Sequence, residues 1–117
     1  MLEFVSLSGP MGADPKSPES RGRRFRLMRQ VMGEHMTQTI MARAIGVTQG
    51  SWTAYENGTR FPKRANLDLL VTATHFPKEW IEDGNIRDIG PDLMRRLIRA
   101  EKELEQAQRA ELKKKRS

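Results

Sequence analysis

Residues 26–62 constrain the fold of this chain most strongly, because they hold two short apolar stripes at helical spacing on either side of one glycine. Met41 and Ile45 lie four residues apart, and Trp52 and Tyr55 lie three residues apart. Side chains three or four positions apart share one face of a helix, so each pair marks the inner face of a short helix. The stripes therefore predict two consecutive helices that pack on one core.

The junction between these helices has the composition of a tight, steep turn. Gly46 stands where the first helix, 38–45, must end, and glycine adopts a left-handed backbone conformation without steric cost. Ala42 is small enough for the second helix, 49–57, to cross closely, and Val47 fills the corner. We therefore expect a helix, a turn and a second helix that crosses the first.

Each of these helices is preceded by a threonine and begins with a glutamine. Thr37 and Thr48 stand immediately before the helices, where a hydroxyl can accept hydrogen bonds from unpaired backbone amides. Gln38 and Gln49 follow as the first helical residues. The repeated pair predicts two capped helix starts.

The chain resembles the phage repressor and Cro family of helix-turn-helix domains, also called the XRE family, over the stretch RLMRQVMGEHMTQTIMARAIGVTQGSWTAYENGTRFP. Weaker similarity continues to about Asp83. The resemblance implies an all-α fold, a five-helix lambda-repressor-like helix-turn-helix domain with an extra C-terminal helix. It also implies a structural ion pair between Arg29 and Glu56, which match an arginine of the family's first helix and the glutamate that closes its recognition helix.

The resemblance further implies that residues 49–57 form a recognition helix, which lies in the major groove of double-stranded DNA. Gln49 is the expected base reader, because its amide can donate and accept hydrogen bonds together against adenine. The predicted base-contacting positions are Gln49, Gly50, Ser51, Thr53 and Ala54. Since Gly50 and Ala54 offer little to read with, DNA shape is expected to contribute to specificity. The predicted phosphate contacts are Gln38, Arg43, Asn57, Thr59, Arg60, Lys63 and Arg64.

Some of these residues have a purely structural alternative. Trp52 could be imagined to stack on a base, but its place in the apolar stripe predicts a core side chain. Arg43 is either a phosphate contact or a solvated helix residue. Asn57 and Gly58 are expected to end the recognition helix, a role compatible with a phosphate contact at Asn57.

Composition argues against several other function classes. The sequence has no cysteine, which removes disulfides, thiolate zinc sites and cysteine nucleophiles and fits a reducing cytoplasm. His35 and His75 have no second ligand at a metal spacing, so we expect no metal and no cofactor. Without a glycine-rich phosphate loop or a nucleophile motif, we expect no enzyme. No apolar run could span a bilayer and no signal peptide is visible, so we expect a cytoplasmic protein of a prokaryotic cell or phage, associated with the nucleoid through DNA.

The net charge of +6 is unevenly distributed along the chain. Nine basic and two acidic residues give +7 in 21–64, and nine basic and four acidic residues give +5 in 93–117. By contrast, 65–92 carries −4 from two basic and six acidic residues, and 1–20 carries −2 from one basic and three acidic residues. A polyanion is therefore drawn to the predicted helix-turn-helix and to the C-terminal segment.

The prolines, the glycines and the changes in composition along the chain predict five segments. The prolines and glycines of 1–20 suggest a flexible N-terminal extension, in which Leu2, Phe4, Val5 and Leu7 could form a short strand against a partner. Within the helix-turn-helix domain, further helices are expected at 21–32, 65–75 and from Pro77 to Gly84. The segments are the extension (1–20), the domain (21–84), a linker (85–90), a C-terminal helix (91–112) and a basic tail (113–117).

The C-terminal helix carries a narrow apolar seam at alternating spacings of four and three, formed by Leu93, Leu97, Ala100, Leu104 and Ala107. This seam predicts a helix for homodimerisation or for a protein partner. The alternative is a solvated helix that folds back on the domain. The closing run of three lysines and one arginine is expected to be a disordered tail that adds nonspecific phosphate contacts or solubility.

The sequence therefore favours a sequence-specific, DNA-binding transcriptional regulator, a repressor that acts as a homodimer on half-sites about one helical turn apart. The alternative is a protein-interaction module, such as an antitoxin-like or adaptor protein that acts through the C-terminal helix. Gln49 and Arg60 would matter most in the first case, and Leu97 and Leu104 in the second.

Overall fold

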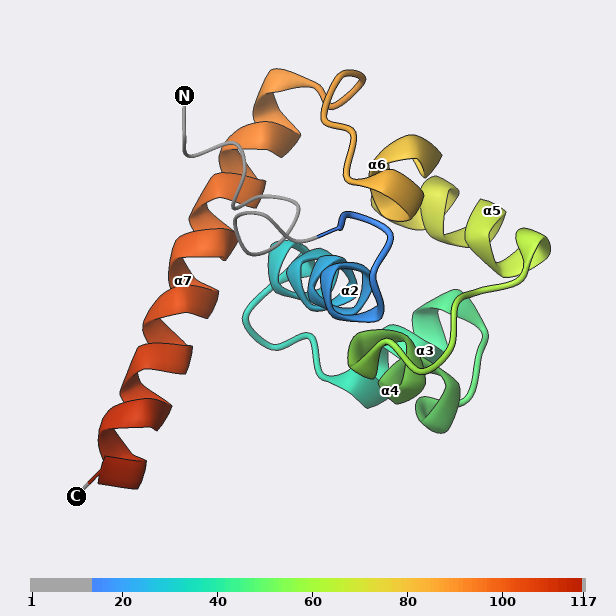
Figure 1. The fold of residues 1–117 in the computed structure, drawn as a ribbon. Coiled ribbons are helices and arrows are strands. Elements are labelled where there is room, and N and C mark those ends of the chain that lie inside the picture. Colours follow the sequence, from blue (N-terminus) through green and yellow to red (C-terminus); the bar gives the residue numbers. More distant parts are fainter. Residues whose placement is uncertain (1–13, 117) are drawn as a thin grey trace.

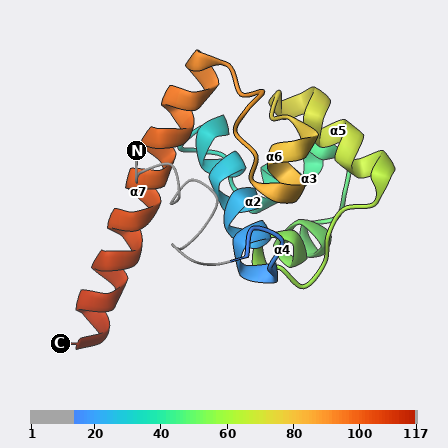
Figure 2. The same ribbon diagram turned by 45° about the horizontal axis from the view of Figure 1, so that its top comes forward.

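The computed structural model of the chain describes residues 14–116 and shows only helices in that range. They are α2 (Pro18–Met32), α3 (Gln38–Ile45), α4 (Gln49–Asn57), α5 (Arg64–Thr74), α6 (Lys78–Asp83) and α7 (Pro91–Arg116). Figure 1 shows α2 at the centre, with the long α7 on one side and α3 to α6 on the other. The turned view in Figure 2 shows the same order. The predicted all-α fold, a helix-turn-helix unit with an additional C-terminal helix, is confirmed.

The helix-turn-helix itself has the predicted bounds, because its signals are local. The hydroxyl of Thr37 accepts from the backbone N–H of Ile40, and that of Thr48 accepts from Ser51, both at 3.1 Å. Gly46 ends α3 in the left-handed conformation, with φ 87°, and its N–H donates to the carbonyl of Ala42 at 2.9 Å.

The flexible N-terminal extension was predicted to continue to residue 20, but α2 already begins at Pro18. Ser17 caps this helix by accepting from the N–H of Ser20 at 3.2 Å, and proline is favoured at a first helical position. Ser20 is fully buried. The strand suggested at Leu2–Leu7 lies outside the described residues.

The C-terminal helix is longer than predicted. α7 continues to Arg116, so the basic run is helical and the expected disordered tail is wrong for residues 113–116. Ala, Glu, Gln, Leu, Lys and Arg fill this end of the helix, all strong helix formers, and basic side chains near a helix C-terminus are electrostatically favourable. α5 also begins and ends one residue earlier than predicted. It ends at Thr74 because His75 adopts the left-handed conformation that terminates a helix.

An aromatic cluster around Phe25 forms the centre of the core. The Phe25 ring lies 5.7 Å from Trp52 in an edge-on arrangement, 5.4 Å from Tyr55 and 6.0 Å from Phe61. Trp52 is completely buried, which confirms the core role predicted for it. The contacts of Phe25 with Trp52 and Tyr55 join α2 to α4.

The predicted C-terminal seam packs on the chain's own core. Leu97 and Ala100 are buried, and Leu93 and Leu104 are half-buried against the same core cluster. α7 contacts α2, whereas Ala107, nearer its end, is exposed. This placement matches the alternative interpretation, a helix that folds back on the domain. The central residues of the seam, Leu97 and Ala100, are therefore buried by contacts within the same chain.

Candidate nucleic-acid interface

The orientation of α4 is fixed by a buried carboxylate near its C-terminal end. Glu56 is only 3% exposed. Arg29 of α2 binds it through two hydrogen bonds, from Nε to Oε2 at 2.6 Å and from Nη2 to Oε1 at 3.1 Å. Gln38 of α3 donates to Oε1 at 3.1 Å, and the Trp52 indole N–H donates to Oε2. The ion pair implied by the family resemblance is therefore present, and it holds three helices together.

α2 and α4 also approach at backbone distance. A Cβ atom added at Gly22 would collide with the backbone carbonyl of Glu56. Only a residue without a side chain allows this approach, so Gly22 brings α2 against the C-terminal end of α4. Together with the carboxylate hydrogen bonds, the contact leaves α4 little freedom to rotate.

The opposite face of α4 is accessible to a partner. Trp52, Tyr55 and Glu56 point into the protein, whereas the predicted base-contacting residues are exposed or half-exposed: Gln49, Gly50, Ser51, Thr53 and Ala54. A Cβ atom at Gly50 would meet nothing closer than 4.0 Å. The face is therefore shallow and unobstructed, as a helix that enters a DNA groove requires.

Gln38 has a structural role that the sequence analysis did not predict. Its amide nitrogen donates to Glu56, and its amide oxygen accepts from the Thr53 hydroxyl at 3.0 Å. An amide group carries two N–H donors, so one hydrogen remains for a phosphate. Gln38 and Thr53 thus tie the start of α3 to the middle of α4.

The other predicted phosphate contacts are exposed around the recognition helix. They are Arg43 on α3, Asn57 at the end of α4, Thr59 and Arg60 in the following loop, and Lys63 and Arg64 at the start of α5. The loop folds back on α4, since the Thr59 hydroxyl donates to the carbonyl of Ala54 at 3.3 Å. The Arg60 guanidinium donates to the hydroxyl of Ser51 at 3.2 Å.

Arg24 is a structural residue that the sequence analysis missed. It is fully buried, and its guanidinium donates to the carbonyls of Ile81 at 3.1 Å and Glu82 at 3.0 Å. Burial, together with the neighbouring Arg21, lowers the pKa of Arg24 to about 10, so the side chain stays charged at neutral pH. Its position four residues before Met28, on the same helix face, was the available signal.

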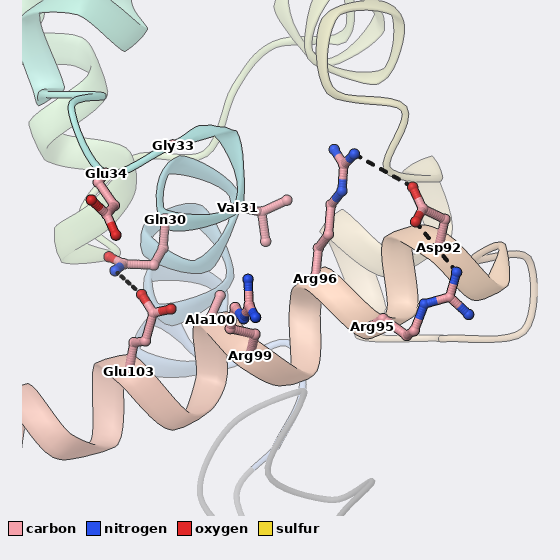
Figure 3. Close-up of a pocket in the computed structure, with 10 residues that line it drawn as sticks. All are labelled: Gln30, Val31, Gly33, Glu34, Asp92, Arg95, Arg96, Arg99, Ala100 and Glu103. Atoms are coloured by element: carbon pink, nitrogen blue, oxygen red, sulfur yellow. Dashed lines mark hydrogen bonds and ion pairs between the residues drawn. The ribbon is translucent and has the colours of Figure 1, made fainter.

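A hollow of about 490 Å³ lies between α2 and α7 (Figure 3). The Asp92 carboxylate lies 3.4 Å from the Arg95 guanidinium and 3.5 Å from that of Arg96, and Gln30 donates to Glu103 at 3.0 Å. The lining of the hollow has no strong excess of one charge, because it contains three arginines and three carboxylates. They are Arg95, Arg96, Arg99, Glu34, Asp92 and Glu103. The exposed face of α4 is therefore the better candidate for a polyanion.

Two other kinds of site find no support in the part of the chain that the structure describes. No group of three or more histidine and carboxylate side chains is placed to hold a metal ion there. Within the same residues, no helix is both long enough and apolar enough to cross a membrane.

The capped α3, the left-handed turn and the locked α4 with its open polar face define a helix-turn-helix, a DNA-binding class of domain. The chain belongs to the helix-turn-helix domain family, whose model matches residues 22–83, just over half of its length. The match begins within the first half of α2 and continues to the end of α6. Comparisons with curated proteins and with solved structures found no similar protein.

Proposed function

We propose that this protein is a sequence-specific transcriptional regulator that inserts α4 into the major groove of duplex DNA. The observation that carries the proposal is the open face of α4, with Gln49 at its first turn, on a helix fixed from behind by Glu56. A base reader must be held within a fraction of an ångström, and a rigid helix provides that precision. The resemblance to phage repressors and Cro proteins favours a repressor.

The charge distribution supports this choice of partner. The segment 21–64, which contains most of α2 and all of α3 and α4, carries +7, whereas the segment 65–92, which contains most of α5 and all of α6, carries −4. Such a division concentrates DNA near the recognition helix and orients the domain as it approaches. Because each phosphate contact releases counterions, affinity is expected to fall steeply with salt.

A homodimer would place two copies of α4 on half-sites about one helical turn apart. Leu97 and Ala100 are already engaged within the chain. A dimer contact through α7 is therefore left to its outer positions, such as the exposed Ala107 and Leu112. Association through these positions would leave the packing of α7 on α2 intact.

The second candidate function is a protein-interaction role for α7, as in an antitoxin-like or adaptor protein. The observation that favours it is the apolar Leu112 side chain, which is 57% exposed near the end of α7. In that case variants of α4 would leave function unchanged, whereas Leu112→Asp would abolish partner binding.

A selection from random duplex DNA tests the leading proposal. Wild type, Gln49→Ala and the control Gln108→Ala, which removes an exposed amide on α7, are compared at moderate and high salt. We expect a palindromic motif for wild type and for Gln108→Ala. Gln49→Ala should relax one position in each half-site, by about 1–3 kcal/mol of discrimination. No enriched motif, with a salt-sensitive affinity indifferent to Gln49, would contradict the proposal.

A further inference from the structure

Arg60 follows the recognition helix in sequence, but its side chain returns toward the start of that helix. The N–H groups of Thr59 and Arg60 both donate to the carbonyl of Ala54, at 3.0 and 3.3 Å, so the loop folds back along α4. From there, Nη1 of Arg60 reaches the Ser51 hydroxyl at 3.2 Å. A residue from the loop thereby lies beside the predicted base-reading face.

Ser51 holds this guanidinium in place. The Ser51 oxygen accepts one hydrogen bond from Arg60 and another from the Thr48 hydroxyl, at 3.0 Å. Thr48 itself caps α4, so the arrangement is continuous with the start of the recognition helix. An arginine oriented in advance loses less conformational entropy when it binds.

The guanidinium of Arg60 remains available for a ligand. Arg60 is exposed and forms no ion pair within the described residues, in contrast to Arg29, which is held by the buried Glu56. A guanidinium has five N–H donors in a planar fork, and Ser51 uses one of them. The other donors are enough for a bidentate hydrogen bond.

Arg60 also lies where α4 itself has few reading groups. Gly50 and Ala54 have no polar side-chain atoms, and Ser51 adjoins Gly50 and lies one turn before Ala54. In the major groove, guanine presents two acceptors, O6 and N7, whose spacing matches the arginine fork. Lysine provides the charge but not the fork.

The geometry points to Arg60 as a second base reader, which recognises a guanine in the major groove instead of the phosphate expected from the sequence. The inference rests on the proposed function, since it assumes that α4 enters that groove. Gln49 and Arg60 would then read different bases of one half-site, and Ser51 would act as the positioning residue for Arg60. The competing placement of the guanidinium is on a phosphate beside the small hollow that it lines with Lys16 and Arg21.

DNA selection with Arg60→Ala, Arg60→Lys, Ser51→Ala and the control Arg64→Ala tests this inference. Arg64 is also exposed, so Arg64→Ala removes the same charge, but Arg64 lies at the start of α5. We expect a guanine in the wild-type motif whose enrichment is lost in Arg60→Ala and in Arg60→Lys, with a loss of roughly 10-fold or more in preference over the other bases. Ser51→Ala should reduce that preference partially, and Arg64→Ala should weaken all sequences equally.

Two results would overturn the inference, and they differ from each other. If wild type selects a motif and Arg60→Ala leaves that motif unchanged, with a uniform loss of affinity and a shallower salt dependence, Arg60 contacts phosphate and only this inference fails. If wild type selects no motif, the proposed function fails and the assignment of Arg60 fails with it.

Discussion

Among the interfaces of α2, those with α4 and with α7 each contain an arginine of α2 paired with a buried glutamate. At the α4 interface, both oxygens of Glu56 accept hydrogen bonds, from side chains of three helices. At the α7 interface, Oε1 of Glu101 binds Arg23, whereas Oε2 has no hydrogen-bond partner in the described residues. The same pair of residue types is therefore fully satisfied in one place and only partly in the other.

This difference indicates what each interface does. Directional hydrogen bonds around Glu56 and the backbone contact at Gly22 specify one orientation of α4, the helix proposed to read DNA. α7 is attached mainly by the burial of Leu97 and Ala100, which stabilises contact without specifying orientation so strictly. The orientation of α4 is therefore fixed mainly by polar contacts, whereas α7 is attached mainly by apolar ones.

Among the variants that test this difference between the two interfaces, Glu56→Ala should reduce the free energy of unfolding most. It leaves Arg29, Gln38 and the buried Trp52 without their carboxylate acceptor, and breaking a buried pair typically costs about 3–5 kcal/mol. We expect a loss of this size in the free energy of unfolding, measured by urea denaturation and followed by tryptophan fluorescence. Glu111→Ala, at an exposed position of α7, is the control. A loss below about 1 kcal/mol would show that the hydrogen bonds do not fix α4.

Leu97→Ala should produce the next largest effect. Removing a buried leucine side chain costs roughly 2–5 kcal/mol, and we expect a value near the lower end because α7 can shift to fill part of the space. The matched control is Leu112→Ala, where the same side chain is 57% exposed and the change should stay within about 0.5 kcal/mol. Equal effects of the two variants in urea denaturation would contradict the packing of α7 on α2.

Glu101→Gln should produce the smallest effect, with the opposite sign. Burial raises the pKa of Glu101 above 4.5, more than the hydrogen bond and charge of Arg23 lower it, and the nearby Glu105 raises it further. The folded chain therefore binds a proton more tightly than the unfolded chain, and this contribution to stability is lost as pH rises through the raised pKa.

The effect of this substitution should accordingly depend on pH. Relative to wild type, Glu101→Gln should be more stable at neutral pH than it is below pH 4.5, where the wild-type carboxyl is protonated. Urea denaturation of both proteins at the two pH values measures the difference, with Glu111→Gln as the control. A difference that does not change with pH would mean that Glu101 is not desolvated at the interface between α7 and α2.

Local signals were sufficient for the parts of the fold that the sequence predicted correctly. The bounds of α3 and α4 follow from Thr37, Gly46 and Thr48, whose effects extend over one helical turn. The signal for the early start of α2 was also local, since Ser17 and Pro18 form a capped helix start. The other prolines nearby obscured this signal.

Long-range contacts account for what the sequence analysis missed. Arg24 binds carbonyls of α6, and Gln38 joins α3 to α4; both partners are distant in sequence. The seam of α7 could equally have met a second chain, and only the three-dimensional arrangement shows Leu97 buried against its own domain. The fate of an amphipathic helix is decided by the partner available, which periodicity does not reveal.

Dimethyl sulfate footprinting on the selected duplex would test the central claim most directly, because the reagent methylates guanine N7 in the major groove and adenine N3 in the minor groove. We predict protection of guanine N7 in two patches about one helical turn apart, with protection near the guanine read by Arg60 lost in Arg60→Ala. Protection of adenine N3 alone, or no protection by bound protein, would contradict the insertion of α4 into the major groove.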